Sequence, residues 1–171
     1  YRFYDGHGAA AGLPGPRMKL LTDLHRAIDR GEIEVHYQPI VSLADGRLER
    51  AEALLRWRHR ERGIVANELF LAMAEDNVLI ERLGREVFRQ TVADIAHWQT
   101  SGALPPEFCV HVNFSPRELR APDFARMAVD TLFEYGVSAE RVCMEITERS
   151  LLDPGLLDAK WAGELVGMGL K

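Results

Sequence analysis

The chain has 171 residues, 47% of them hydrophobic, which is enough for one globular domain. A complete (β/α)8 barrel is excluded by length, because it needs roughly 200 residues or more. The 21 basic and 26 acidic residues give a formal net charge of −5, which argues against a surface that coats a DNA or RNA duplex.

The sequence shows no signal peptide, no apolar stretch long enough to span a membrane, and only two cysteines, Cys109 and Cys143, without the spacing of a zinc site. A cytoplasmic protein with reduced thiols is therefore expected. Residues 1–17 are rich in glycine and proline and have no helical or strand period, so they are predicted to be a linker.

A helix and a hairpin are predicted to follow the linker. Apolar residues recur at helical spacing from Met18 up to a stop at Gly31. Two extended runs, Ile33–Val41 and Leu48–Trp57, then flank an Asp-Gly turn, which is typical of an antiparallel hairpin.

The rest of the chain alternates helical and extended patterns. The predicted helices are residues 66–76, 79–101, 123–135 and 155–167, and the predicted strands are residues 108–114 and 141–147. Ser115 and Glu118 have the spacing of a capping box, so a helix begins directly after the first of these strands. The order of strands and helices implies parallel strands with helical crossovers and an α/β fold.

Polar residues recur at the ends of three predicted strands. Because side chains alternate along a strand, Glu52, Asn113 and Glu145 lie on faces that are not purely apolar, at or near the C-terminal part of each strand. Ligands and catalytic groups collect at this end of parallel strands. Two carboxylates and a carboxamide are an all-oxygen set that suits Mg²⁺ or Mn²⁺ better than zinc. The pattern alone is compatible with a shared metal site and equally with separate rim and turn residues.

The other polar candidates are weaker. His36 and His111 are isolated histidines on strands, where a hydrogen-bonded core or rim group is the more common role than a metal ligand. The run over residues 56–62 contains four arginines and His59, and it is predicted to be a charged, solvated loop.

Five ordered motifs resemble the EAL domain, a family of phosphodiesterases that act on cyclic di-GMP. They are Tyr37–Val41, the Glu-Ala-Leu sequence at 52–54 with Arg56-Trp57, Arg62-Gly63 with Ala74-Glu75, Val112–Ser115, and Glu145–Glu148. The resemblance covers residues 18–171 and implies the first part of an EAL-type (β/α)8 TIM barrel with an antiparallel first strand. Residues 1–4 are similar to the end of a GGDEF domain, so residues 1–17 are expected to be the tail of that upstream module and a linker.

The resemblance also implies roles for single residues. The divalent-metal ligands of the family correspond to Glu52, Asn113 and Glu145. The positions that contact its nucleotide correspond to Gln38, Leu54 and Arg56. A further glutamate, which holds the loop that shapes the metal and dimer region, corresponds to Glu148.

The family reaction is the hydrolysis of one phosphodiester bond of cyclic di-GMP to linear pGpG, with two Mg²⁺ or Mn²⁺ ions that activate water. Family members continue into a strand that ends in Asp-Asp-Phe-Gly-Thr-Gly, whereas this sequence stops at Lys171. We therefore expect the 171 residues alone to be inactive and the parent protein, a homodimer with an upstream GGDEF domain and sensor domains, to be the phosphodiesterase. A non-catalytic cyclic di-GMP receptor is the alternative.

Overall fold

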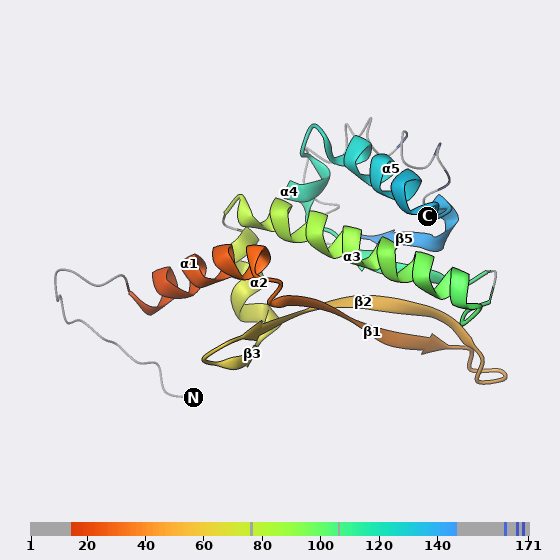
Figure 1. Cartoon of the computed structure of the whole chain (residues 1–171), viewed down its shortest axis with the longest axis horizontal. Coiled ribbons are helices and arrows are strands. Elements are labelled where there is room, and N and C mark those ends of the chain that lie inside the picture. Colours follow the sequence, from red (N-terminus) through yellow and green to blue (C-terminus); the bar gives the residue numbers. More distant parts are fainter. Residues whose placement is uncertain are drawn as a thin grey trace.

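One mixed sheet, with helices packed on one of its faces, organises the chain (Figure 1). The computed structural model describes residues 15–75, 77–105, 107–146, 163, 167 and 169. Glu148 and nearly all of the helix predicted over 155–167 lie outside the described residues. Among the helices that the structure describes, none combines the length and the apolar character needed to cross a bilayer.

The sheet confirms the predicted hairpin and the predicted parallel strands. Its strands are β1 (Ile33–Val41), β2 (Leu48–His59), β3 (Gly63–Val65), β4 (Cys109–Asn113) and β5 (Val142–Glu145). The order is β1-β2-β4-β5, with β3 paired to β2. Strands β1 and β3 run antiparallel to β2, whereas β2, β4 and β5 are parallel to one another. The three parallel strands therefore point toward the same edge of the sheet, and β2 extends beyond β4 and β5 at that edge.

The helices agree with the predicted pattern, and α3 is the longest of those described. They are α1 (Pro16–Asp29), α2 (Asn67–Glu75), α3 (Leu79–Ser101), α4 (Pro116–Leu119) and α5 (Phe124–Tyr135), with a short 3₁₀ helix η1 (Ala139–Arg141) before β5. Figure 1 shows α3, in green, running along the β1–β2 hairpin. Helix α3 contacts both β1 and β4, so one helix supports strands that lie far apart in the sequence.

The core lies between the sheet and the helices. Trp57, Phe70 and Phe88 are fully buried there, and the ring centroids of Trp57 and Phe70 are 5.7 Å apart. The Tyr37 hydroxyl of β1 donates a 2.6 Å hydrogen bond to Asp94 Oδ2 of α3. Burial and the Asp94 carboxylate raise the pKa of Tyr37, so this hydroxyl keeps its proton at any physiological pH.

The prediction of a charged loop over residues 56–62 is wrong for residues 56–59, which belong to a strand. Strand β2 continues to His59, which is 7% exposed and packs on Trp57 with ring centroids 5.2 Å apart. Arg58 donates a 2.8 Å hydrogen bond to Glu34 on β1. Strand β3, which the sequence pattern did not predict, pairs with this end of β2, and three residues are too few to display a strand period.

Candidate functional site

The predicted metal residues lie on the face of the sheet opposite the helical core. On β2, the neighbours Ala51 and Ala53 of Glu52 are buried in that core, so the Glu52 side chain points to the other face. In the parallel pairing, Asn113 of β4 aligns with Glu145 of β5. Side chains at aligned positions share a face, and Glu52 aligns with His111, so the three residues occupy one face. Asn113 and Glu145 end their strands, as predicted, whereas Glu52 lies in the first half of β2 because that strand continues to His59.

Glu52 and Asn113 are in direct contact. The Asn113 side chain donates from Nδ2 to Glu52 Oε1 at 2.7 Å, which joins β2 to β4 through side chains. This hydrogen bond does not use Asn113 Oδ1 or Glu52 Oε2. Both of these oxygens are of the type that a hard divalent cation binds.

Glu145 has a different partner on β4. Its Oε1 lies 2.5 Å from Nδ1 of His111, and Nε2 of the same imidazole lies 3.4 Å from Nη1 of Arg50 on β2. His111 is buried and has two hydrogen-bonding partners, which confirms its prediction as a satisfied group. The contact with Glu145 was not predicted. The alternation along β4 already placed His111 and Asn113 on one face, but only the alignment of β4 with β5 reveals which carboxylate His111 contacts.

The residues predicted to contact a nucleotide lie on the same face as the predicted metal residues. Gln38 of β1 pairs directly with Glu52 of β2, and Leu54 follows Glu52 by two residues. Arg56 lies two residues further along β2 and donates from Nη1 to the Leu55 carbonyl at 2.8 Å. The structure therefore brings Gln38 next to Glu52, one of the predicted metal residues, and places Arg56 further along the strand.

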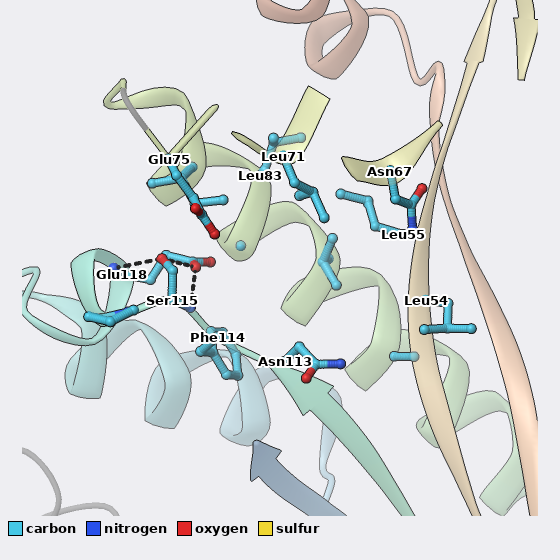
Figure 2. Close-up of a pocket in the computed structure, with 15 residues that line it drawn as sticks. Leu54, Leu55, Asn67, Leu71, Glu75, Leu83, Asn113, Phe114, Ser115 and Glu118 are labelled. Atoms are coloured by element: carbon cyan, nitrogen blue, oxygen red, sulfur yellow. Dashed lines mark hydrogen bonds between the residues drawn. The ribbon is translucent and has the colours of Figure 1, made fainter. Parts of the chain in front are cut away.

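A cavity of about 300 Å³ lies between β2, β4 and helices α2, α3 and α4, mainly on the side of the sheet that the helices cover. Of the predicted site residues, Leu54 and Asn113 line it. Figure 2 shows Leu54 and Asn113 on one side of it and the carboxylates of Glu75 and Glu118 on the other. Most of its lining is apolar, including Leu71 of α2. A few polar groups in an apolar cavity are typical of a small-molecule site.

Glu118 is the buried acid of this cavity. It is 5% exposed, and Oε2 accepts hydrogen bonds from the Ser115 amide at 2.7 Å and from the Ser115 hydroxyl at 2.5 Å. The predicted capping box is thus confirmed, and its glutamate lies against Gly84 of α3. Burial, with smaller contributions from the Glu75 and Glu81 carboxylates, raises the pKa of Glu118 to about 7. No sequence pattern predicts this burial, because it depends on contact with Gly84 of α3, which lies more than 30 residues earlier in the chain.

The donor set of Glu52, Asn113 and Glu145 fits a hard divalent cation by its chemistry, with two carboxylates and an amide oxygen. Across the part of the chain that the structure describes, no group of three or more His, Cys, Asp or Glu side chains is placed to hold a metal. The three predicted residues would supply oxygen ligands only, and a hexacoordinate ion such as Mg²⁺ would need further ligands from water, substrate or other residues.

Comparison with known sequences identifies the family. The family model of the EAL domain matches residues 21–163. PdeI of Escherichia coli, described as a probable cyclic di-GMP phosphodiesterase, is 34% identical over 126 residues, which are 74% of this chain and 16% of that protein. An uncharacterized signaling protein of Caulobacter vibrioides is 38% identical over 135 residues, which are 79% of this chain and 16% of that protein. The chain thus spans less than a fifth of the length of these two relatives.

Solved structures match the fold. The PaMucR phosphodiesterase, in a c-di-GMP complex, gives a TM-score of 0.82 at 26% identity, over 89% of this chain and 61% of that one. The FimX EAL domain of Xanthomonas citri, in complex with c-diGMP, gives a TM-score of 0.78 at 23% identity, over 91% of this chain and 59% of that one. These matches confirm the predicted α/β fold as the first part of the EAL-type (β/α)8 barrel.

Proposed function

The chain belongs to the EAL domain family, and on that premise we propose that it forms the first part of a metal-dependent cyclic di-GMP phosphodiesterase domain. The observation that carries the proposal is the arrangement of Glu52, Asn113 and Glu145 on one face, with Asn113 hydrogen-bonded to Glu52 at 2.7 Å. Three oxygen-donor side chains from three parallel strands lie on that face. The solved c-di-GMP complexes of related domains support the same ligand for this chain.

In this proposal, Glu52, Asn113 and Glu145 hold Mg²⁺ or Mn²⁺. The bound ion supplies charge neutralisation at the phosphate and a nucleophilic water. Asn113 orients Glu52 through the hydrogen bond between them and presents its own Oδ1 to the ion. The net reaction adds one water to one phosphodiester bond of cyclic di-GMP and yields linear pGpG.

Three further residues bind the nucleotide in this proposal. Gln38 lies beside Glu52 in the β1–β2 pairing and supplies an amide that reaches the same face. Leu54 lines the cavity and provides apolar contact to a base. Arg56 supplies the positive charge for a phosphate oxygen. Glu148, outside the described residues, keeps its predicted role in holding the adjacent loop.

We further propose that the 171 residues alone do not turn over cyclic di-GMP, because the Asp-Asp segment of the family lies outside them. The assignment of residues 1–17 to the tail of a GGDEF module stays a prediction, as do upstream sensor domains, a homodimer and a cytoplasmic location. The relatives, which are several times longer than the matched segment, support a multidomain parent.

The direct test compares this chain with a polypeptide that continues through the Asp-Asp segment. Both are incubated with cyclic di-GMP and Mg²⁺ or Mn²⁺, and linear pGpG is measured by chromatography. We expect turnover only by the longer polypeptide, and its loss in Glu52→Gln. Nucleotide binding without turnover by the longer polypeptide would instead identify a receptor. Absence of both binding and turnover would refute the proposed function.

A further inference from the structure

We propose that His111 is a positioning residue that orients the Glu145 carboxylate for the divalent cation. This inference rests on the proposed function, because it assumes that Glu145 is a metal ligand. It assigns to His111 a role that neither the sequence pattern nor the resemblance to the family implied. The argument starts from the place of His111 in the sheet.

His111 lies in the middle of the sheet, on the strand between the other two parallel strands. Its backbone aligns with Glu52 on β2 and with Cys143 on β5. The His111 side chain is 10% exposed, whereas the Glu145 side chain is 41% exposed. A nearly buried imidazole thus contacts a carboxylate that is open to solvent on its other side. The buried partner is the one whose position the surrounding sheet fixes.

The contacts of the imidazole define which nitrogen carries the proton. The ionised Glu145 carboxylate has only acceptors, so Nδ1 donates in this contact, and Nε2 is then the nitrogen that Arg50 approaches at 3.4 Å. The neutral ring then carries its proton on Nδ1, which donates to Glu145 Oε1 at 2.5 Å. A hydrogen bond to an ionised carboxylate is shorter and stronger than one between neutral groups. Arg50 and His111 together therefore hold one oxygen of Glu145 and leave Oε2 outside this contact.

Strand β4 supplies one side-chain hydrogen-bond donor to a carboxylate on each of the two strands beside it. Asn113 donates to Glu52 on β2, and His111 donates to Glu145 on β5. The two donors lie two residues apart on β4 and hence on the same face. Each predicted carboxylate ligand thus has one oxygen held by β4. In metal sites, partners of this kind fix the orientation of the ligands, and their removal costs about 10- to 100-fold in metal affinity.

The test measures Mn²⁺ affinity of the chain from the EPR signal of the free ion. We expect His111→Leu to weaken Mn²⁺ binding by about 10-fold or more. His111→Asn, which keeps a donor near the position of Nδ1, should restore most of the affinity. His36→Leu is the matched control, because His36 lies on the same sheet face, contacts Glu34, and has no contact with a predicted ligand among the interactions described for it.

A second measurement separates positioning from a general loss of structure. In a Glu145→Gln background, a positioning residue has nothing left to orient, so His111→Leu should cause little further loss of Mn²⁺ affinity. A structural defect would weaken binding by the same factor in both backgrounds. Nitrogen NMR of the imidazole should also show the proton on Nδ1 in the unsubstituted chain.

The outcomes distinguish this inference from the proposed function. If Glu52→Gln and Glu145→Gln weaken Mn²⁺ binding but His111→Leu does not, the metal site stands and the positioning role is wrong. Equal losses from His111→Leu in both backgrounds also overturn the positioning role. If Mn²⁺ does not bind, or binds equally to the two glutamine variants, the proposed metal site fails and the positioning role fails with it.

Discussion

The two faces of β2 have different surroundings, although successive side chains of the strand point alternately to one face and the other. Ala51 and Trp57 are buried against the helices, whereas Glu52 and Arg56 lie on the opposite face with polar partners. The helical face is dominated by apolar packing, and the other face by hydrogen bonds between neighbouring strands. One strand therefore contributes to stability and to the candidate site through separate sets of side chains. Substitutions on the two faces should consequently have different effects.

The largest expected effect lies on the helical face, at Trp57. The side chain is fully buried and its ring packs edge-on against Phe70 with centroids 5.7 Å apart. We expect Trp57→Ala to lower the free energy of unfolding by about 3–5 kcal/mol, because it leaves a large cavity in the core. Urea denaturation followed by circular dichroism measures this change. A loss below about 1 kcal/mol would show that the helical face is not the main source of stability.

The second largest expected change in stability is at Glu118, which is buried against α3. Glutamine has nearly the same shape as glutamate but carries no charge, so Glu118→Gln tests the effect of the charge. The pKa of Glu118 is about 7 in the folded chain against a usual value of 4.5, so the folded state binds more protons between these two pH values. Stability from this group is therefore fully present below pH 4.5 and is lost as the pH rises through 7. Glu118→Gln keeps an acceptor for Ser115 and should be more stable than the parent at pH 8, by up to about 3 kcal/mol.

Asp123 provides a control for the predicted pH dependence at Glu118. Asp123 is an exposed carboxylate whose pKa is lowered by the hydrogen bond from Arg85, so its stabilising contribution is lost as the pH falls. The substitution Asp123→Asn should change the slope in the opposite sense to Glu118→Gln. Urea unfolding at a series of pH values measures both slopes. Parallel curves for Glu118→Gln and the parent would contradict a raised pKa at Glu118.

The alternation of side chains made much of the candidate site predictable from sequence. The period alone predicted that Glu52, Asn113 and Glu145 lie on faces that are not purely apolar, and the structure has them on one face. The predicted place near the strand end is confirmed for Asn113 and Glu145 and is wrong for Glu52, because β2 extends to His59. The helix boundaries followed from the apolar period, as for α3, which was predicted over 79–101 and spans those residues. These features depend on neighbours close in the sequence, so local pattern is sufficient to predict them.

Features that depend on contacts far along the chain were not predictable in the same way. The burial of Glu118 arises from its contact with Gly84, and the partner of Glu145 is set by the alignment of β4 with β5. His59 was expected in a solvated loop, but its buried position depends on the packing of β2 against α1, where it approaches Asp23. In each case the deciding contact joins residues at least 30 positions apart, which no local period encodes.

A smaller loss of stability is expected on the helical face at Tyr37, whose substitution tests a polar contact within the core. Tyr37→Phe keeps the ring that packs edge-on against Trp98 but removes the hydrogen bond to Asp94. We expect a loss of about 2 kcal/mol in the free energy of unfolding, because a hydrogen bond to a charged group is lost and the carboxylate loses a partner. Urea denaturation measures the loss. Unchanged stability would mean that water replaces the hydroxyl at no cost.

The smallest change in stability is expected at Asn113, whose neighbour Val112 lies on the opposite face of β4. Val112 is 1% exposed, so Val112→Ala should cost about 2 kcal/mol and leave Mn²⁺ affinity unchanged. Asn113 is exposed, so Asn113→Ala should cost about 0.5 kcal/mol and weaken Mn²⁺ binding, since the proposed oxygen ligand and the donor to Glu52 are both lost.

The pair of variants is measured by urea denaturation and by Mn²⁺ titration on the same preparations. If Val112→Ala weakens Mn²⁺ binding as much as Asn113→Ala does, the two faces are coupled and the candidate site depends on core packing. If Asn113→Ala costs as much stability as Val112→Ala, the hydrogen bond to Glu52 is part of what holds β2 to β4. We expect Val112→Ala to change stability alone and Asn113→Ala to change mainly Mn²⁺ affinity. This is physically possible because side chains alternate along β4, so residues on one face pack in the core while residues on the other face are available to bind an ion.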